Sequence, residues 1–148
     1  MVISFKKVSV LVAEDNPAIS SIYRQVLEEL DFGKITMTSD GDRAFEAFCE
    51  LKHDIIISDW EMEPTSGMEF LRKVRKSEAS PDRMVPFIFI TGYAAQSKIQ
   101  KATHEGMTAF IVKPFTVEKL AEKLEDIINN PPEFLVGDES LEADGRAT

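Results

Sequence analysis

Three carboxylates, one hydroxyl and one ammonium group in this 148-residue chain directly follow or end short apolar runs, and their chemistry is complementary. They are Glu14 and Asp15, Asp59, Thr91 and Lys113. Carboxylates that are crowded together repel one another, and the positive charge of a divalent cation relieves this repulsion. Mg²⁺ suits such a site because it binds one or two carboxylates and keeps several of its waters. A lysine pairs with a carboxylate at rest and with phosphate oxygens when they arrive, and a threonine hydroxyl donates to a phosphoryl oxygen. Gathered in one place, these residue types suit phosphoryl transfer onto a carboxylate.

The elements that would position these residues alternate along the chain. Five β-branched runs predict strands, at Val8–Ala13, Ile35–Thr38, Asp54–Ser58, Pro86–Thr91 and Ala109–Val112. Amphipathic stretches that predict helices follow them, at about 17–31, 42–51, 67–77, 95–105 and 116–129. Strict alternation favours an α/β fold, a doubly wound parallel sheet of five strands with helices on both faces. Ligands of such sheets bind beyond the carboxyl ends of the strands, where the polar residues above are expected to meet.

Two local signals mark helix starts. Asn16-Pro17 combines a capping residue with a proline at the first helical position. Thr116 supplies a cap for the last helix, without the glutamate or glutamine that completes a capping box. These signals predict helices that begin at about residues 17 and 117.

The composition excludes several classes of protein. A net charge of −9 and a pI near 4.7 argue against a nucleic-acid partner, because phosphate contacts need clustered Lys and Arg. No apolar run approaches the ~18 residues of a membrane span, so no membrane partner is expected. The single cysteine, Cys49, cannot form an internal disulfide and favours a reducing, cytoplasmic location. Because it lies with Phe45 and Phe48 in an apolar helical stretch, Cys49 is expected to pack in the core or at its edge, half-buried.

The chain is expected to form one folded domain over residues 1–130, followed by an acidic tail over 131–148. The tail is small, acidic and non-periodic after Pro132, which predicts flexibility. The N-terminal segment has no signal-peptide cleavage site. We find no internal repeat.

Four motifs in this order resemble the receiver domain of two-component response regulators. They are the acid pair Glu14-Asp15, the strand end ISDWEM with Asp59, the pair Thr91-Gly92, and KPF at Lys113–Phe115. Each motif alone is common, but together they occupy the ends of alternate elements. The resemblance covers roughly residues 6–130 and implies a flavodoxin-like sheet with the strand order 2-1-3-4-5.

The resemblance implies a role for each acidic residue. Asp59 is expected to accept a phosphoryl group from the phosphohistidine of a histidine kinase or a histidine phosphotransfer protein. Asp15 and Asp59 are expected to hold Mg²⁺ together with the backbone carbonyl of Glu61, while Glu14 acts mostly through water. Lys113 is expected to bind the phosphoryl oxygens and to precede a cis peptide bond to Pro114.

The resemblance also implies a switch, in which Thr91 bonds the phosphoryl group and Phe110 follows by changing rotamer. Many family members carry tyrosine where this chain has Phe110, so no hydroxyl reports the movement here. The usual Met-Pro after the acceptor is spread as Met62-Glu63-Pro64, which predicts a different loop. Glu61 and Tyr93 occupy positions that the family uses to set phosphate lifetime.

The leading interpretation is a single-domain response regulator, not an enzyme, that signals to a downstream protein by phosphorylation-dependent contact. One alternative is a receiver-fold module that partners bind whatever its phosphorylation state. Another is a Mg²⁺-dependent phosphatase with an aspartate nucleophile, although Asp59-Trp60-Glu61 lacks the second aspartate of that pattern. A flavodoxin is disfavoured because Glu14 and Asp15 would repel its phosphate, and no P-loop motif occurs. Trp60 is interpreted either as a packing residue or as a recognition residue.

Overall fold

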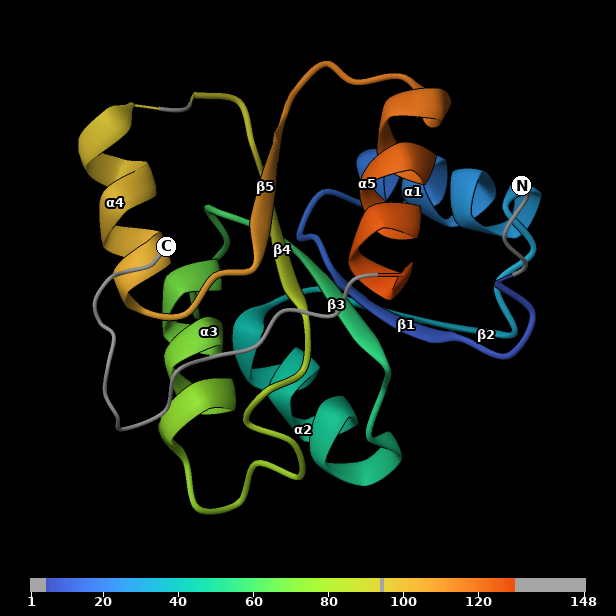
Figure 1. Cartoon of the computed structure of the whole chain (residues 1–148). Helices are drawn as coiled ribbons and strands as arrows, with labels where there is room; N and C mark the ends of the chain where they lie inside the picture. The colour runs from blue at the N-terminus through green and yellow to red at the C-terminus, as the bar shows by residue number, and fades with distance from the viewer. Residues whose placement is uncertain (1–4, 94, 130–148) are drawn as a thin grey trace.

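A parallel sheet of five strands, in the order β2-β1-β3-β4-β5, organises the computed structural model, which describes residues 5–93 and 95–129 (Figure 1). The strands are β1 (Ser9–Ala13), β2 (Lys34–Thr38), β3 (Ile55–Asp59), β4 (Phe87–Thr91) and β5 (Ala109–Val112). The helices are α1 (Pro17–Glu29), α2 (Gly41–Leu51), α3 (Gly67–Lys76), α4 (Gln96–His104) and α5 (Val117–Asn129). The alternation and the strand order confirm the predicted fold, with boundaries that differ from the predicted ones by one or two residues.

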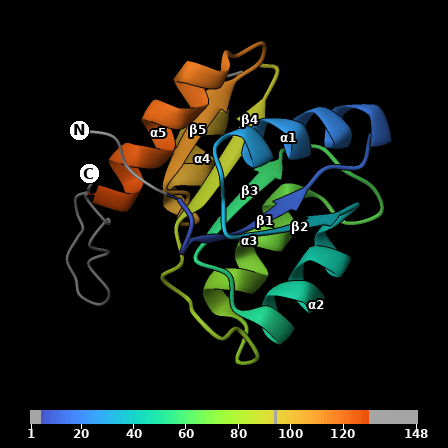
Figure 2. The same ribbon diagram turned by 90° about the vertical axis from the view of Figure 1, so that its right-hand side faces the viewer.

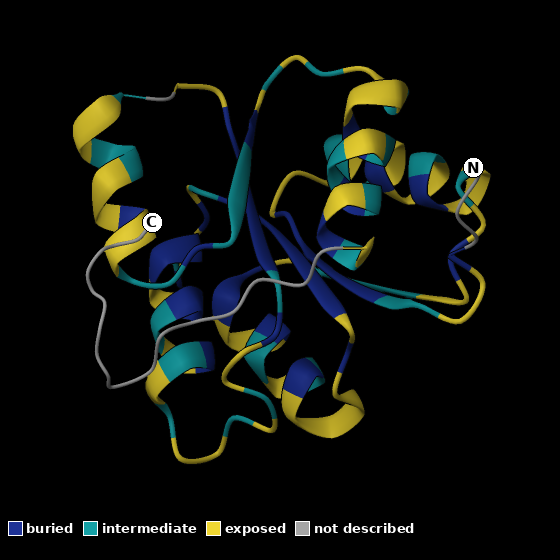
Figure 3. Ribbon diagram, viewed as in Figure 1, coloured by how far each residue is buried: buried dark blue, intermediate teal, exposed yellow. Residues whose placement is uncertain are grey.

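Helices cover both faces of the sheet. α1 and α5 lie together on one face, and α2, α3 and α4 lie on the other (Figures 1 and 2). Successive residues of a strand point to opposite faces, so Val10 and Val12 of β1 join the core under α1 and α5, whereas Leu11 joins the core under α2 and α3. The central strands β1, β3 and β4 are buried on both sides (Figure 3), which explains their nearly continuous apolar sequence.

The helix starts agree with the predicted caps. The side chain of Asn16 accepts hydrogen bonds from two backbone amides of α1, whose first residue is Pro17. Thr116 Oγ1 accepts from the amide of the third residue of α5 at 3.0 Å. α3 begins with a capping box that was not predicted, in which Ser66 and Glu69 each accept a hydrogen bond from the other's backbone amide. This box holds the start of α3 next to the end of β3.

The predicted core or half-buried position of Cys49 is wrong, because its side chain is exposed on α2. Ala44 and Phe48 lie one helical turn apart and both face the sheet, with 0% of each exposed. Cys49 is the next residue along the helix and is rotated by roughly 100° toward solvent. The sulfur lies 3.6 Å from the carbonyl oxygen of Ala79.

The predicted acidic tail over residues 131–148 lies outside the described residues and stays a prediction. The start of the predicted domain, residues 1–4, lies outside them as well. Within 5–93 and 95–129, no helix combines the length and the apolar character needed to cross a membrane.

Candidate functional site

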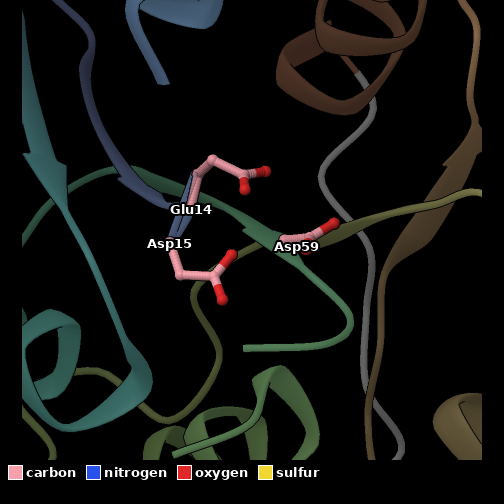
Figure 4. Close-up of side chains that lie close together, drawn as sticks. All are labelled: Glu14, Asp15 and Asp59. Atoms are coloured by element: carbon pink, nitrogen blue, oxygen red, sulfur yellow. The ribbon is translucent and has the colours of Figure 1, made fainter. Parts of the chain in front are cut away.

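The predicted acidic residues meet at the carboxyl edge of the sheet. β1 and β3 are parallel neighbours with Ala13 opposite Ser58, so the residues that follow in each strand lie side by side. Figure 4 shows Glu14 and Asp15, at the end of β1, with their carboxyl groups pointing toward the side of Asp59. One carboxylate oxygen of each residue lies within 4.8 Å of the others.

Asp59, the last residue of β3, is 9% exposed and forms an ion pair at this edge. Lys113, which follows β5, places its Nζ 2.9 Å from Oδ1 of Asp59. Burial raises the pKa of the Asp59 carboxyl, and the charge of Asp15 adds to this effect, whereas Lys113 acts in the opposite direction. The net rise in the pKa of Asp59 means that the surrounding groups only partly balance the negative charge of its ionised carboxylate. A further cation at this position would therefore be favourable.

Glu14 brings a second buried carboxylate to the same edge. It is 3% exposed, and its Oε2 accepts a hydrogen bond from the amide of Asn16 at 3.0 Å. Among the described residues, Oε1 of Glu14 has no hydrogen-bond partner although it is fully buried. Burial raises the pKa of the Glu14 carboxyl, and Asp59 raises it further.

The donor set fits a magnesium ion. A buried carboxylate oxygen without a donor is costly, and a hydrated cation can satisfy it. The oxygens of Glu14, Asp15 and Asp59 are hard ligands that lie close enough to share one ion or its waters. Asp15 is exposed and lines, with Glu61 and Trp60, a cavity of about 590 Å³ beside these acids.

Thr91 and Lys113 lie on the other side of Asp59 in the sheet. The amide of Lys113 donates to the carbonyl of Thr91 at 2.8 Å, which ties the end of β5 to the end of β4. Thr91 is 3% exposed. Thr91 and Lys113 line, together with Asp59, a cavity of about 270 Å³. The structure thus brings both predicted phosphoryl-binding residues to the predicted acceptor.

The loops around the site contain two cis peptide bonds, Lys113-Pro114 and Glu63-Pro64. The resemblance implied the first one. The second one lies in the loop after β3, at the place where the sequence spreads the usual Met-Pro, and was not anticipated. That loop returns to the sheet through a hydrogen bond of 3.0 Å from the amide of Gly67 to the carbonyl of Trp60.

Phe110 is half-buried in β5, opposite Phe89 of β4. Its side chain packs against the core that lies under α2, α3 and α4. No hydroxyl is present, so its contribution to any switch comes from packing.

Sequence reasoning missed one residue of this site, Lys98 of α4. Its Nζ lies 4.5 Å from the centre of the Trp60 ring, and Lys98 lines the cavity of about 270 Å³ together with Asp59. Trp60 in turn packs against Phe89, with ring centres 4.6 Å apart. Nothing in the local sequence distinguishes Lys98 from other helical lysines, because its position depends on how α4 packs beside the sheet.

Comparisons with known proteins agree with this geometry. Residues 10–125 match the model of the response regulator receiver domain. The chemotaxis protein CheY of Pseudomonas aeruginosa is 30% identical over 118 residues, which cover 80% of this chain and 94% of that protein. The chemotaxis protein CheY-3 of Vibrio cholerae is 30% identical over 122 residues, which cover 82% of this chain and 92% of that protein.

Solved structures show the same likeness. The chemotaxis response regulator CheY4 of Vibrio cholerae has a TM-score of 0.74 and 26% identity, and the match covers 82% of this chain and 98% of that one. The receiver domain of the sensor histidine kinase PA1611 of Pseudomonas aeruginosa has a TM-score of 0.74 and 27% identity, covering 83% of this chain and 98% of that one. That structure has a magnesium ion coordinated in its active site cleft.

Receiver domains generally bind Mg²⁺ at an acidic pocket and interact with histidine kinases or phosphotransfer proteins, and their general function is phosphorylation-dependent signalling. The family model spans nearly all of the described sheet and helices. The relatives named above are covered almost over their full length. This chain belongs to the response regulator receiver domains and is similar to the chemotaxis protein CheY.

Proposed function

We propose that this protein accepts a phosphoryl group on Asp59 from the phosphohistidine of a histidine kinase or a phosphotransfer protein, with Mg²⁺ as cofactor. The observation that carries the proposal is the ion pair of 2.9 Å between Lys113 and Asp59 at the edge where Glu14 and Asp15 gather. An isolated surface carboxylate would need neither this cation nor these acidic neighbours. The ion pair holds the ammonium group of Lys113, which can bind phosphoryl oxygens, next to the carboxylate of Asp59, the proposed nucleophile.

The residues of the chain divide the work. A carboxylate oxygen of Asp59 forms a bond to phosphorus while the bond from phosphorus to the histidine nitrogen breaks. Lys113 then exchanges the carboxylate for the oxygens of the transferred group. Asp15, Asp59 and the backbone carbonyl of Glu61 would hold Mg²⁺, with Glu14 acting through water. When bound, the ion neutralises negative charge on the phosphoryl oxygens.

Intact-mass measurement tests the acceptor directly. The protein is incubated with Mg²⁺ and acetyl phosphate, and we expect the mass of one phosphoryl group to be gained. Asp59→Asn removes the nucleophilic oxygen at nearly constant shape, so the gain should vanish. Asp54→Asn is the matched control, since Asp54 precedes the opposite end of β3 and should leave the gain unchanged. Undiminished incorporation in Asp59→Asn would rule out this assignment.

We further propose that the signal leaves through contact with a downstream protein, and that the protein acts as a switch and not as an enzyme. The net charge of −9 opposes a nucleic-acid target. Cys49 is the single cysteine of the sequence and cannot form an internal disulfide, which supports a reducing, cytoplasmic location.

Residues 1–130 form the proposed receiver domain and carry out the phosphorylation chemistry, and residues 131–148 are not required for it. All of the side chains that carry the site lie between Glu14 and Lys113. A chain that ends at residue 130 should therefore take up phosphate at the rate of the full chain. Loss of phosphorylation in a truncated protein with an unchanged circular dichroism spectrum would contradict this division.

A further inference from the structure

Lys98 is a second lysine beside Asp59, and the chemistry described above does not use it. It lines the cavity of about 270 Å³ that also contains Asp59 and Lys113. The two lysines reach this cavity from different elements, Lys98 from α4 and Lys113 from the residue after β5. The cavity therefore has positive charge from two independent directions.

Trp60 holds Lys98 at this cavity. The Nζ of Lys98 lies 4.5 Å from the centre of the indole ring, which is within the range of a cation–π interaction. The ring is itself held by Phe89 of the central strand β4. Lys98 is half-buried, so fewer conformations are open to its side chain than to a fully exposed lysine.

Lys98 also differs from Lys113 in whether its ammonium group has a carboxylate partner. Lys113 lies 2.9 Å from a carboxylate oxygen of Asp59. Among the described residues, no carboxylate oxygen lies within 4.0 Å of the Nζ of Lys98. A charge-assisted hydrogen bond to an anion is stronger than a partly solvated cation–π contact, so an anion that enters the cavity can draw the ammonium away from the ring.

The other charges at the cavity explain what such a cation would do. Asp59 and Glu61 both line the cavity, and the carboxylates of Glu14 and Asp15 lie behind Asp59. An incoming phosphodonor is itself an anion and is repelled by these groups. Lys113 is already paired with Asp59, so of these two ammonium groups Lys98 is the one that is available to the donor, in addition to the Mg²⁺ of the proposed function.

We infer that Lys98 is a second anion-binding residue of the phosphorylation site, which binds the phosphate oxygens of a small-molecule phosphodonor and holds the donor over Asp59. The inference rests on the proposed function and adds a positioning residue to the same site. With acetyl phosphate as the donor, an oxygen of Asp59 bonds to phosphorus while the bond from phosphorus to the acyl oxygen breaks. The acid leaves as a carboxylate with the electron pair, and no proton transfer is required.

The test compares rates of phosphorylation by acetyl phosphate in the presence of Mg²⁺. Lys98→Met removes the charge and keeps an apolar chain against Trp60, and Lys98→Arg keeps the charge. Lys101→Met is the matched control, because Lys101 is an exposed lysine of the same helix that does not line the cavity. Each variant is measured at low and at high salt, with circular dichroism to compare the folded state.

We expect the second-order rate constant of Lys98→Met to fall about three- to fivefold at low salt, and the deficit to shrink as salt screens the charge. Lys98→Arg should retain the wild-type rate, and Lys101→Met should match wild type throughout. A rate for Lys98→Met equal to that of Lys101→Met would overturn the inference while leaving the proposed function intact. A deficit in Lys98→Met that salt does not reduce, or that Lys98→Arg shares, would indicate a structural role and would also overturn it. Failure of the wild type to be phosphorylated would instead refute the proposed function.

Discussion

The hydroxyl of Thr91 is held within its own loop by Tyr93. Oγ1 of Thr91 donates to the Tyr93 carbonyl at 3.0 Å and accepts from the Tyr93 amide at 3.2 Å. A hydroxyl has one proton to donate, so Thr91 cannot bond a phosphoryl oxygen without releasing the Tyr93 carbonyl. The proposed bond from Thr91 to a phosphoryl group on Asp59 would therefore couple phosphorylation to the conformation of the loop after β4.

This coupling predicts the behaviour of Thr91→Ala. The variant should still be phosphorylated on Asp59, because Thr91 is not the nucleophile, but the loop should no longer respond. In NMR spectra we expect the phosphorylation-induced shifts of the Tyr93 amide and of the Phe110 ring to be largely lost. Thr91→Ser, which keeps the hydroxyl, should retain them.

The same variant separates the two modes of partner binding. If partners read the phosphorylated state, the ratio of partner affinities with and without phosphorylation should fall toward one in Thr91→Ala. An unchanged ratio would favour the alternative in which partners bind the receiver whatever its phosphorylation state.

Replacing Asp59 by Asn should stabilise the protein in the absence of Mg²⁺. The raised pKa of the Asp59 carboxyl means that the fold disfavours the ionised form, and this penalty is complete above the folded-state pKa. We expect the free energy of unfolding at about pH 7 to rise by about 1 kcal/mol, measured by urea denaturation. Added Mg²⁺ should stabilise the wild type more than Asp59→Asn, so the difference should shrink. A variant that is less stable than wild type without Mg²⁺ would contradict the uncompensated charge at this edge.

Gly67 should not tolerate any side chain, because its Cα packs against the backbone of Asp59. A Cβ at Gly67 would approach the backbone oxygen of Asp59 to 2.2 Å and the ring of Phe89 to 2.7 Å. Backbone cannot yield cheaply, so Gly67→Ala should lower the free energy of unfolding by about 2–3 kcal/mol. Gly92→Ala is the control, because nothing lies within 4 Å of its Cβ. Equal stabilities of the two variants would show that the start of α3 can move away from β3.

His53 should contribute to the dependence of stability on pH. It is 1% exposed, and its Nε2 lies 2.9 Å from Oγ1 of Thr36. Burial, and then the charge of Lys34, lower the pKa of the His53 imidazole. As the pH falls below about 6.5, the unfolded chain takes up a proton that the folded chain refuses, so stability decreases until the folded-state pKa is passed.

His53→Gln should remove this part of the acid destabilisation, measured as the difference in the free energy of unfolding between about pH 7 and pH 5. His104→Gln is the matched control, since His104 is exposed at the end of α4. If His53→Gln kept the full pH dependence of the wild type, the buried imidazole would not be its source.

The sequence by itself determined the elements, their order and the acidic edge. Apolar β-branched runs that alternate with amphipathic stretches allow few folds, and parallel strands bring their carboxyl ends together. Glu14, Asp15 and Asp59 were therefore predictable as neighbours from their places at strand ends. The ammonium of Lys113 followed by the same reasoning.

Only the tertiary structure decided how each of these groups is solvated and paired. Adjacent acids differ, with Glu14 buried and Asp15 exposed. Cys49 points to solvent beside the buried Phe48, and Lys98 of α4, which lies 38 residues further along the chain than Trp60, reaches the ring of Trp60. Such relations depend on the rotation and packing of whole elements against the sheet, which are set by the summed contacts of many side chains and leave no local pattern in the sequence.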